Sequence, residues 1–453
     1  MATHPSMSEQ RLITRDVLRK MVRYAFPAFM ASFLVFFMNF INYIFMAMFM
    51  DYTKIATYGV VSAYTTLAAG FFAPLATGTG LVMERARKDN DPHKIQNAIN
   101  TSMLSTVIVG VLSTLAAILL SKVYVIGLHT PEEIVPETIT FLRYFSFTYI
   151  PILYFSVTTV ILNQLGEHTP PILAEVSAIA LHFGFGYIFV GLFDWGLTGC
   201  AVSAVIAQTT AGVINTHIIL QVRRRLNART PTQIDRKLYL EVIREERTGI
   251  ITTILGGFFA VFMQYFINEL GITVIAAFSL FFVLQEALFV PIHALRTPAR
   301  RLSAEYYESG SNRELMNAVT PMLLLAVVYT LLLIPLLQLI GPPVFMMLSH
   351  DPDVTIVGMR LLTLVSHYYA FYAATTLLSS SLEGLGQNRL TMSMNIGFNY
   401  FVRFLVLIAC VFVIHGEESI AICYPASWAI SAGALVIYYY ATYPFFGQKK
   451  YSL

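Results

Sequence analysis

Charged residues are scarce in this sequence. Only 12% of its 453 residues are Asp, Glu, Lys or Arg, about half of the ~25% that is typical of a soluble domain. Hydrophobic residues make up 56% of the chain, and the mean hydropathy is +0.65. Apolar runs of ~20 residues, the length that crosses ~30 Å of hydrocarbon, recur along the whole sequence. The shortage of charge excludes a soluble globular protein and indicates a polytopic membrane protein.

Cysteine is rare as well. The three cysteines, Cys200, Cys410 and Cys423, lie in apolar stretches, and none belongs to a C-x-x-C pair. A free cysteine in such a stretch behaves as a small buried hydrophobe. The spacing supports neither a metal cluster nor a disulfide framework, and we expect no metal and no other cofactor.

Nucleotide-binding motifs are missing too. The sequence has no G-x-x-x-x-G-K-[ST], the loop with which many ATPases hold phosphates. Its longest cytoplasmic stretch is about 25 residues, which is too short for a nucleotide-binding domain. We therefore expect neither an enzyme nor a nucleic-acid partner. Work done by such a chain must draw on an ion gradient, on the gradient of its substrate or on another protein.

Counting the apolar runs between polar breaks predicts an all-α fold with twelve transmembrane helices. The runs lie near residues 24–49, 56–82, 97–121, 138–164, 170–192, 196–221, 248–268, 273–297, 315–340, 355–385, 390–414 and 419–445.

The basic residues divide unevenly among the connections. Twenty-four of the 29 Lys and Arg residues fall in the N-terminal tail, the connections after even-numbered helices and the C-terminal tail. The opposite connections hold only Lys54, Lys122, Arg143 and Arg360. Loops rich in Lys and Arg stay on the cytoplasmic side of a membrane. We therefore expect a multi-pass protein of the cell membrane, inner or plasma, with both termini in the cytoplasm.

Short motifs recur about 220 residues apart. LNQLGEH at 162–168 matches LEGLGQN at 382–388, and QNAI at 96–99 matches MNAV at 316–319. Three weaker pairs occur in the same order: Pro131 with Pro352, FFAP with LFVP, and MNFIN with MQYFIN.

This repeat predicts two six-helix lobes. We expect an N-terminal lobe at 1–222, a basic cytoplasmic linker at 223–247 and a C-terminal lobe at 248–453. Because six is an even number, both halves cross the membrane in the same direction, and their two-fold axis runs along the membrane normal. Parallel repeats of this kind commonly enclose a cavity that opens alternately to each side.

Two stretches carry a family resemblance. The sequence VILNQLGEHTPPILAEVSAIALHFGFGYIFVGLFDWGLTGCAVSAVIAQ at 160–208 resembles the fifth and sixth helices of MATE (multidrug and toxic compound extrusion) transporters of the MOP flippase superfamily. FAPLATGTGLVMERARKDNDPHKIQNAIN similarly resembles the exit of the family's second helix. The resemblance implies a twelve-helix exporter of organic cations or other amphiphiles, driven by inward movement of Na⁺ or H⁺.

The sequence departs from the family where many members carry aspartates. Asn42 stands at the aligned position in the first helix. In the fifth helix, aligning His182 with the family's asparagine places Gly186 at the second aspartate. The cation site usual in the N-terminal half has then lost both carboxylates, which puts coupling at that place in doubt.

Glu286 is the leading candidate for the coupling acid. It lies 13 residues beyond Thr273, the outer start of the eighth predicted helix, and therefore ~20 Å into the membrane. Its counterpart in the first half, TTLAAG, contains no acid. A charge inside a membrane costs ~2.5–3.5 kcal/mol or more, so such residues are functional candidates. A carboxyl in such a place can bind either a proton or a cationic substrate.

Arg403 gives the competing interpretation. It lies inside the eleventh predicted helix, and helical counting places it up to ~10 Å from Glu286 in depth. Paired with Arg403, Glu286 would stay ionised and carry protons poorly. Without that pair, Arg403 is a candidate anion-binding or gating group. The sequence leaves both possibilities open.

Other polar residues inside the predicted spans complete the candidate site. Glu175 and His182 in the fifth helix are further ion-coupling candidates, although a solvated mouth position and hydrogen-bonded packing are their simpler explanations. The candidates for the substrate cavity are polar or aromatic: Asn42, Gln264, Asn268, Gln285, Tyr368, Tyr369, Asn395 and Asn399. Asn and Gln side chains also hold membrane helices together. About half of these Asn and Gln residues are therefore expected to be structural.

The sequence therefore predicts a secondary active exporter that works by H⁺ or Na⁺ antiport and alternating access. Its expected partners are the bilayer and a small organic substrate, cationic and amphiphilic, and we expect it to act as a monomer. Two alternatives remain. One is a flippase for a lipid-linked or anionic intermediate, with Arg403 and the basic inner rim on the phosphate. The other is a transporter-derived scaffold that no longer transports.

Overall fold

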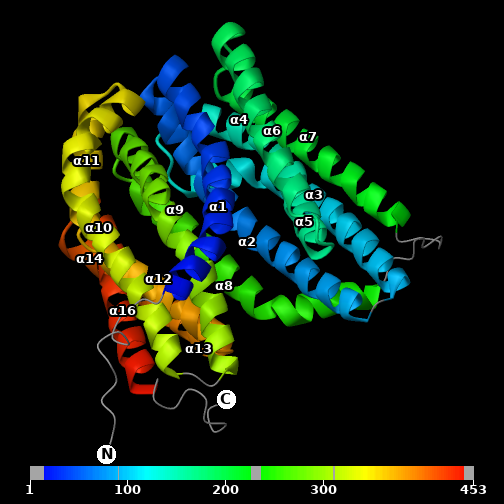
Figure 1. Ribbon diagram of the computed structural model, residues 1–453. Helices are drawn as coiled ribbons and strands as arrows, with labels where there is room; N and C mark the ends of the chain where they lie inside the picture. The colour runs from blue at the N-terminus through cyan, green and yellow to red at the C-terminus, as the bar shows by residue number, and fades with distance from the viewer. Residues whose placement is uncertain (1–14, 90, 226–235, 310–311, 443–453) are drawn as a thin grey trace, which may run out of the picture. The chain divides into compact units, whose positions relative to one another are not determined.

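The protein was analysed as a computed structural model, which describes residues 15–89, 91–225, 236–309 and 312–442 (Figure 1). Within these ranges the regular structure is helical throughout. The first half contains α1 (Arg15–Phe49), α2 (Tyr52–Lys88), α3 (Pro92–Gly127), α4 (Val135–Phe145), η2 (Ser146–Thr148), α5 (Tyr149–Gln164), α6 (Thr169–Gly186), η3 (Tyr187–Leu192) and α7 (Gly196–Arg225). The second contains α8 (Arg236–Asn268), α9 (Ile272–Glu308), α10 (Asn312–Ser349), α11 (Pro352–Ser366), α12 (Tyr369–Gly384), α13 (Asn388–Met394), η4 (Asn395–Val402), α14 (Arg403–Val413), α15 (Glu417–Ala421) and α16 (Cys423–Thr442).

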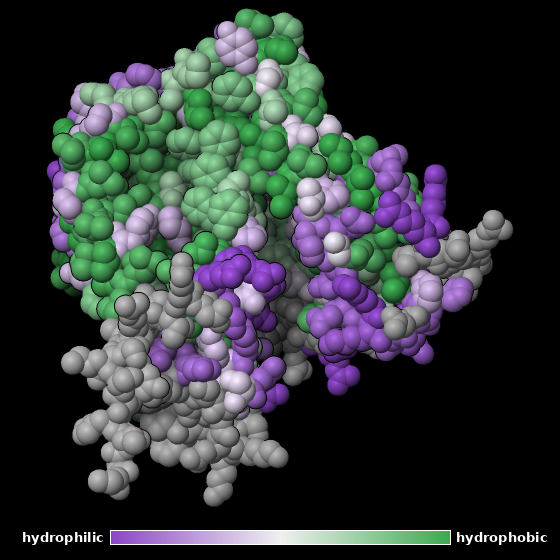
Figure 2. Space-filling model, in the orientation of Figure 1, coloured by the Kyte–Doolittle hydropathy of each residue, from purple (hydrophilic) through white to green (hydrophobic). Residues whose placement is uncertain are grey.

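The number of spans confirms the predicted fold class. Eleven helical segments of the described chain are long and apolar enough to cross a membrane. The twelfth span is a pair of helices, α11 and α12, which meet at a bend of 53°. The surface in view is largely hydrophobic (Figure 2), as expected of helices that face lipid. The protein is an all-α polytopic membrane protein.

The structure differs from the prediction in two spans and adds detail to the linker. The eighth span continues as α9 to Glu308, so Arg296, Arg300 and Arg301 lie on a helix and not in a connection. Hydropathy falls after residue 297, but Arg, Ala, Leu and Glu are good helix formers and extend the helix. The tenth span is two helices. In the predicted linker, α7 continues to Arg225 and α8 begins at Arg236, while residues 226–235 lie outside the described chain.

The backbone repeats with the offset seen in the sequence. Four pairs of residues with positive φ are 220 or 221 residues apart: His129 and His350, Gly166 and Gly386, Asp194 and His415, and Gly196 and Gly416. A non-glycine residue at positive φ is uncommon, so matched pairs are strong evidence of a shared chain path. The fourth span of each half is also broken at matched places, at η2 and at the bend between α11 and α12. These features support two structurally equivalent halves.

The chain forms two compact units, each described here by itself. One comprises residues 1–36, 281–343 and 359–453, and the other comprises residues 37–280 and 344–358. The second unit includes α8, because glycines let α2 and α8 approach closely. A Cβ at Gly257 would lie 2.6 Å from the Cα atom of Leu67, and one at Gly70 would lie 2.8 Å from the carbonyl oxygen of Thr253. The division into lobes at 223–247 stays a prediction.

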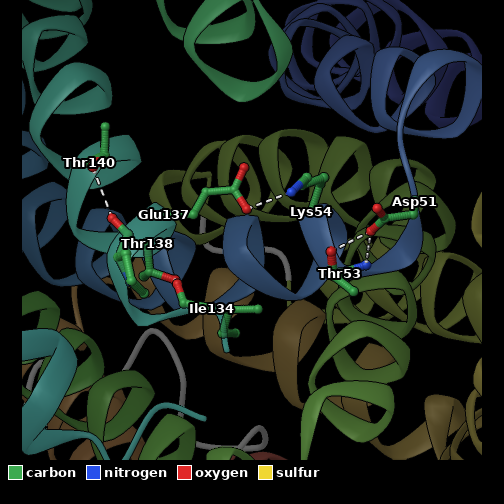
Figure 3. A network of polar contacts seen from close by, with 8 residues as sticks. Asp51, Thr53, Lys54, Ile134, Glu137, Thr138 and Thr140 are labelled. Atoms are coloured by element: carbon green, nitrogen blue, oxygen red, sulfur yellow. Dashed lines mark hydrogen bonds and ion pairs between the residues drawn. The ribbon is translucent and has the colours of Figure 1, made fainter. Parts of the chain in front are cut away.

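The start of α2 is held by polar contacts (Figure 3). Asp51 caps the helix, since its carboxylate accepts a hydrogen bond of 2.8 Å from the backbone N–H of Thr53. Lys54 forms an ion pair of 2.7 Å with Glu137 in the first turn of α4. These contacts fix the α1–α2 turn and join α2 to α4 within the second unit.

Candidate functional site

The first unit contains a polar cavity of about 310 Å³. The cavity is bounded by α9, α12, the segment from η4 to α14, and α16. Its wall combines charged, amide, hydroxyl and aromatic side chains: Gln285, Glu286, Phe289, Arg296, Tyr372, Thr375, Thr376, Ser379, Glu383, Asn395, Asn399, Tyr400, Arg403, Tyr424 and Trp428. Two acids and two arginines in one such space make it the candidate site of a membrane protein that handles charged ligands.

Glu286 opens into this cavity from α9. Its side chain is exposed, and in the described part of the chain no ion pair joins it to Arg403. The neighbouring Gln285 is buried and accepts a hydrogen bond of 3.4 Å from the hydroxyl of Tyr369. Glu286, Phe289 and Arg296 all line the cavity from α9. The acid is therefore presented to a cavity and not to a neighbouring helix.

Arg403 contacts α16. Its Nε donates a hydrogen bond of 2.9 Å to the hydroxyl of Ser427. Its guanidinium carbon lies 4.5 Å from the ring centre of Tyr424 and 6.0 Å from that of Trp428, within the range of cation–π attraction. These contacts hold Arg403 at the cavity wall without Glu286. The proposed pairing of Glu286 with Arg403 stays a prediction, as does the anion-binding or gating role of Arg403.

A π-helical segment, η4, directly precedes Arg403. Its wider turns change the face that later side chains occupy, compared with a regular α-helix. Asn395 and Asn399 lie within it, and the amide of Asn399 donates a hydrogen bond of 2.5 Å to Asn395. Both asparagines line the cavity together with Arg403. Irregular turns of this kind often occur at functional sites.

One wall of the cavity is an aromatic cluster. The rings of Phe289 and Tyr372 are stacked with centroids 4.0 Å apart. Trp428 lies 5.2 Å from Tyr372 and 6.1 Å from Phe289. Such a wall suits a flat or bulky organic group better than a bare inorganic ion.

Two polar atoms in the cavity wall lack hydrogen-bond partners. They are the hydroxyl of Thr375, a side chain that is 5% exposed, and the amide oxygen of Asn399. Leaving a buried polar atom unpaired costs about 1–3 kcal/mol. The cavity is therefore a place where water or a ligand supplies the missing partner.

Four other predicted cavity residues lie elsewhere. Asn42 donates a hydrogen bond of 3.3 Å to the hydroxyl of Tyr58. Gln264 donates to Asn268 at 2.7 Å, and Asn268 in turn donates to the backbone oxygen of Leu128 at 2.9 Å. Asn42 thus joins α1 to α2 and Asn268 joins α8 to a loop, as such side chains often do, whereas the bond of Gln264 lies within α8. Tyr368 is exposed at the bend between α11 and α12.

Glu175 and His182 lie on α6 in the second unit. Glu175 is 7% exposed and His182 is fully buried. One carboxylate oxygen of Glu175 and both ring nitrogens of His182 lack a hydrogen bond of good geometry. The surroundings are apolar, since Ala174 and Ala178 pack against alanines of α7. Their role in ion coupling stays a prediction.

The position aligned with the family's second aspartate is filled by an aromatic ring. A Cβ at Gly186 would lie 2.1 Å from a ring atom of Phe45. Phe45 is itself fully buried, so its ring has little room to move. A carboxylate cannot be accommodated at residue 186 unless Phe45 moves, which agrees with the absence of the aspartate.

Sequence reasoning missed several residues of the cavity, above all Arg296, Tyr372 and Trp428. A signal existed for Arg296, which lies ten residues after Glu286 on the same helix, or slightly less than three turns. It was missed because it was counted with the basic residues of the following connection. Tyr372 and Trp428 carried no comparable signal among the 25 Tyr and two Trp residues.

Twelve spans and a polar cavity walled by membrane helices are the architecture expected of a membrane transporter. The family model described as MatE matches residues 27–188 and 250–408. These two segments begin and end about 220 residues apart, as the repeat requires. Together they cover more than half of the chain, which therefore belongs to the MatE family.

Known relatives agree with this assignment. The chain is 19% identical over 433 residues to the probable multidrug resistance protein YpnP of Bacillus subtilis (strain 168), a match that covers 94% of this chain and 95% of that protein. An inward-facing structure of a multidrug resistance MATE family transporter of the MOP superfamily matches with a TM-score of 0.81 and 14% identity, covering 91% of this chain and 96% of the other. A MOP superfamily transporter from Pyrococcus furiosus Vc1 matches with a TM-score of 0.74 and 15% identity, over 99% and 100% of the two chains. These solved structures share the fold.

Proposed function

We propose that the protein is a secondary active exporter of organic, cationic and amphiphilic compounds, driven by antiport of H⁺ or Na⁺. The observation that carries this proposal is the cavity of the first unit. It presents Glu286, which forms no ion pair with the residues that the structure describes, beside an aromatic wall of Phe289, Tyr372 and Trp428. Relatives named for multidrug resistance support export of organic compounds.

The coupling follows from competition for one acid. Glu286 can neutralise either the coupling ion or a cationic substrate, but it cannot fully neutralise both at once. Binding of the ion on one side of the membrane then promotes release of the substrate, and the reverse occurs on the other side. A cation above the aromatic wall gains cation–π attraction as well.

We place the protein in the inner or plasma membrane of the cell. The distribution of basic residues supports an orientation in which both termini lie in the cytoplasm. In that orientation Arg296 lies nearer the cytoplasmic end of α9 than Glu286 does. The proposed unit of function is the monomer, since the cavity is built from one chain.

Arg296 and Arg403 favour a second candidate function. Both line the cavity that holds Glu286, and guanidinium groups bind phosphate and carboxylate groups well. An anionic amphiphile, such as a lipid-linked intermediate, would contact them while Glu286 is protonated. A flippase is therefore the alternative.

Purified protein in sealed vesicles separates the two functions. Efflux of a cationic fluorescent dye is followed after a H⁺ or Na⁺ gradient is imposed. We expect gradient-dependent efflux in the wild type. In Glu286→Gln the rate of efflux should fall about tenfold, which corresponds to ~1.4 kcal/mol. Glu269→Gln, a substitution of an exposed acid outside the cavity, should transport at the wild-type rate.

Unchanged efflux in Glu286→Gln would reject Glu286 as the coupling acid. Vesicles that move an anionic lipid analogue but no cationic dye, with movement abolished in Arg403→Gln, would favour the flippase.

A further inference from the structure

The cavity continues from Glu286 along α9 as a polar strip. Arg296 and Glu383 line the same space as Glu286, and Arg296 lies ten residues further along α9, or ~15 Å. Between them α12 presents Thr375, Thr376 and Ser379 to the cavity. Hydroxyl and charged groups therefore accompany Glu286 along the part of α9 that leads to Arg296.

Tyr372 lies within this strip, and His293 lies behind it. The Nε2 atom of His293 and the hydroxyl of Tyr372 are 2.8 Å apart. Tyr372 lines the cavity, while His293 lies behind it, seven residues from Glu286 on the same face of α9. An imidazole and a phenol can each accept a proton at one site and release one at another. A hydroxyl with a histidine behind it is thus suited to pass protons toward the acid.

The same strip is a poor path for a sodium ion. An ion entering from the end of α9 must pass the permanent positive charge of Arg296, which donates to the hydroxyl of Ser380 at 3.5 Å. A dehydrated metal cation also needs several oxygen ligands along its path. A proton needs neither, because it moves between hydrogen-bonded groups.

Several charged and titratable groups surround His293 and Tyr372. On α9 they are Glu286 and Arg296, on α12 Glu383, on the segment from η4 to α14 Tyr400 and Arg403, and on α16 Tyr424. The two arginines repel any additional cation that enters the cavity, and the two acids attract positive charge. The transfer of single protons is therefore the charge movement that these groups hinder least.

We propose that Glu286 exchanges protons with the solution through Tyr372 and His293, and that the coupling ion is H⁺. This inference rests on the proposed function. A proton arrives at Nδ1 of His293 as Nε2 gives its own to Tyr372, whose hydroxyl proton passes toward Glu286 through cavity water. The O–H and N–H bonds that break are replaced by those that form. Only the carboxylate changes charge when the transfer is complete.

The test uses full-length protein in vesicles and two readouts. The first is efflux of ethidium driven by a pH gradient, measured in H₂O and in D₂O. The second is exchange of labelled for unlabelled ethidium without any gradient. We expect Tyr372→Phe and His293→Gln to slow gradient-driven efflux about tenfold, to enlarge the D₂O effect, and to slow gradient-driven efflux by a larger factor than exchange. Added imidazole should restore efflux in His293→Ala.

A matched control is available on α10. Tyr329 donates its hydroxyl to the backbone oxygen of Leu288 on α9 at 2.9 Å and does not line the cavity. Tyr329→Phe removes the same atom and should leave both readouts at wild-type values. If His293→Gln does not fold, Tyr372→Phe still gives the result.

The outcomes distinguish the two proposals. If Glu286→Gln stops gradient-driven efflux while Tyr372→Phe and His293→Gln resemble the wild type, the proton route is wrong and the coupling acid stands. Efflux driven by a Na⁺ gradient at constant pH would overturn the assignment of H⁺. If Glu286→Gln has no effect, the proposed function itself fails.

Discussion

Two helices of this protein carry the same pair of residues in different surroundings. On α6 an acid, Glu175, is followed seven residues later by His182, and on α9 Glu286 is followed seven residues later by His293. The pair on α6 is buried in a largely apolar region, with polar atoms that lack hydrogen bonds of good geometry within the described chain. On α9 the acid opens into a polar cavity, and the histidine is bonded to a cavity tyrosine.

The difference shows that residue type and spacing alone do not define a coupling site in a membrane. What distinguishes α9 is access. Its acid faces a space in which a proton or a cationic group can be received, and the wall of that space supplies hydroxyl and aromatic groups. On α6 the two groups lie where closely packed alanines allow helix-to-helix contact. We therefore place coupling on α9.

The largest effect is expected when α6 is overpacked against the ring of Phe45. Gly186→Ala should lower the free energy of unfolding by about 1–3 kcal/mol, because the new methyl group overlaps the buried ring of Phe45. Thermal unfolding in detergent measures this change. Gly184→Ala is the matched control, since a Cβ at Gly184 meets nothing within 4 Å. Equal melting temperatures for the two variants would show that the ring does not close this region.

The second effect concerns the charge of the cavity on α9. Arg403→Gln removes a positive charge from the wall and should strengthen binding of a cationic dye by about tenfold, ~1.4 kcal/mol. Equilibrium binding measured by fluorescence polarisation reports it. Arg389→Gln, on α13 outside the cavity lining, should bind as the wild type does. Weaker cation binding in Arg403→Gln would mean that Arg403 does not repel the ligand.

The smallest effect is expected for the histidine on α6. His182→Leu replaces a buried ring without hydrogen bonds of good geometry by an apolar side chain. Such a replacement is nearly neutral or slightly stabilising, within about 1 kcal/mol. Transport rate and melting temperature should both stay near the wild-type values. A large loss of transport with an unchanged melting temperature would restore His182 as a coupling residue.

Much of the fold was predictable because a membrane imposes simple rules. Apolar runs predicted twelve spans. The matched motifs near Leu162 and Leu382 predicted the internal repeat, and the positive φ values of Gly166 and Gly386 show the same offset in the backbone. The bend between α11 and α12 was not predicted, since the apolar run passes through it. Neither was the extension of α9 beyond residue 297, where helix propensity continues after hydropathy falls.

The candidate site was predicted only in part. Glu286, Gln285, Asn395, Asn399 and Arg403 were identified because polar groups stand out in apolar spans, and the structure brings these five to one cavity. Gln264 and Asn268 look the same in sequence but bind each other and a loop. Polar side chains inside a membrane have two uses, ligand binding and helix contact. Only the packing of neighbouring helices decides between them, and that information is not local in the sequence.

The most direct test of coupling on α9 compares the two acids within one experiment. Vesicles hold a pH-sensitive dye in the lumen, and proton movement is recorded when a cationic substrate is added to wild-type protein, Glu286→Gln or Glu175→Gln. If Glu286 is the coupling acid, substrate-induced proton movement disappears in Glu286→Gln and persists in Glu175→Gln. Proton movement that persists in Glu286→Gln and disappears in Glu175→Gln would contradict this assignment and place coupling on α6.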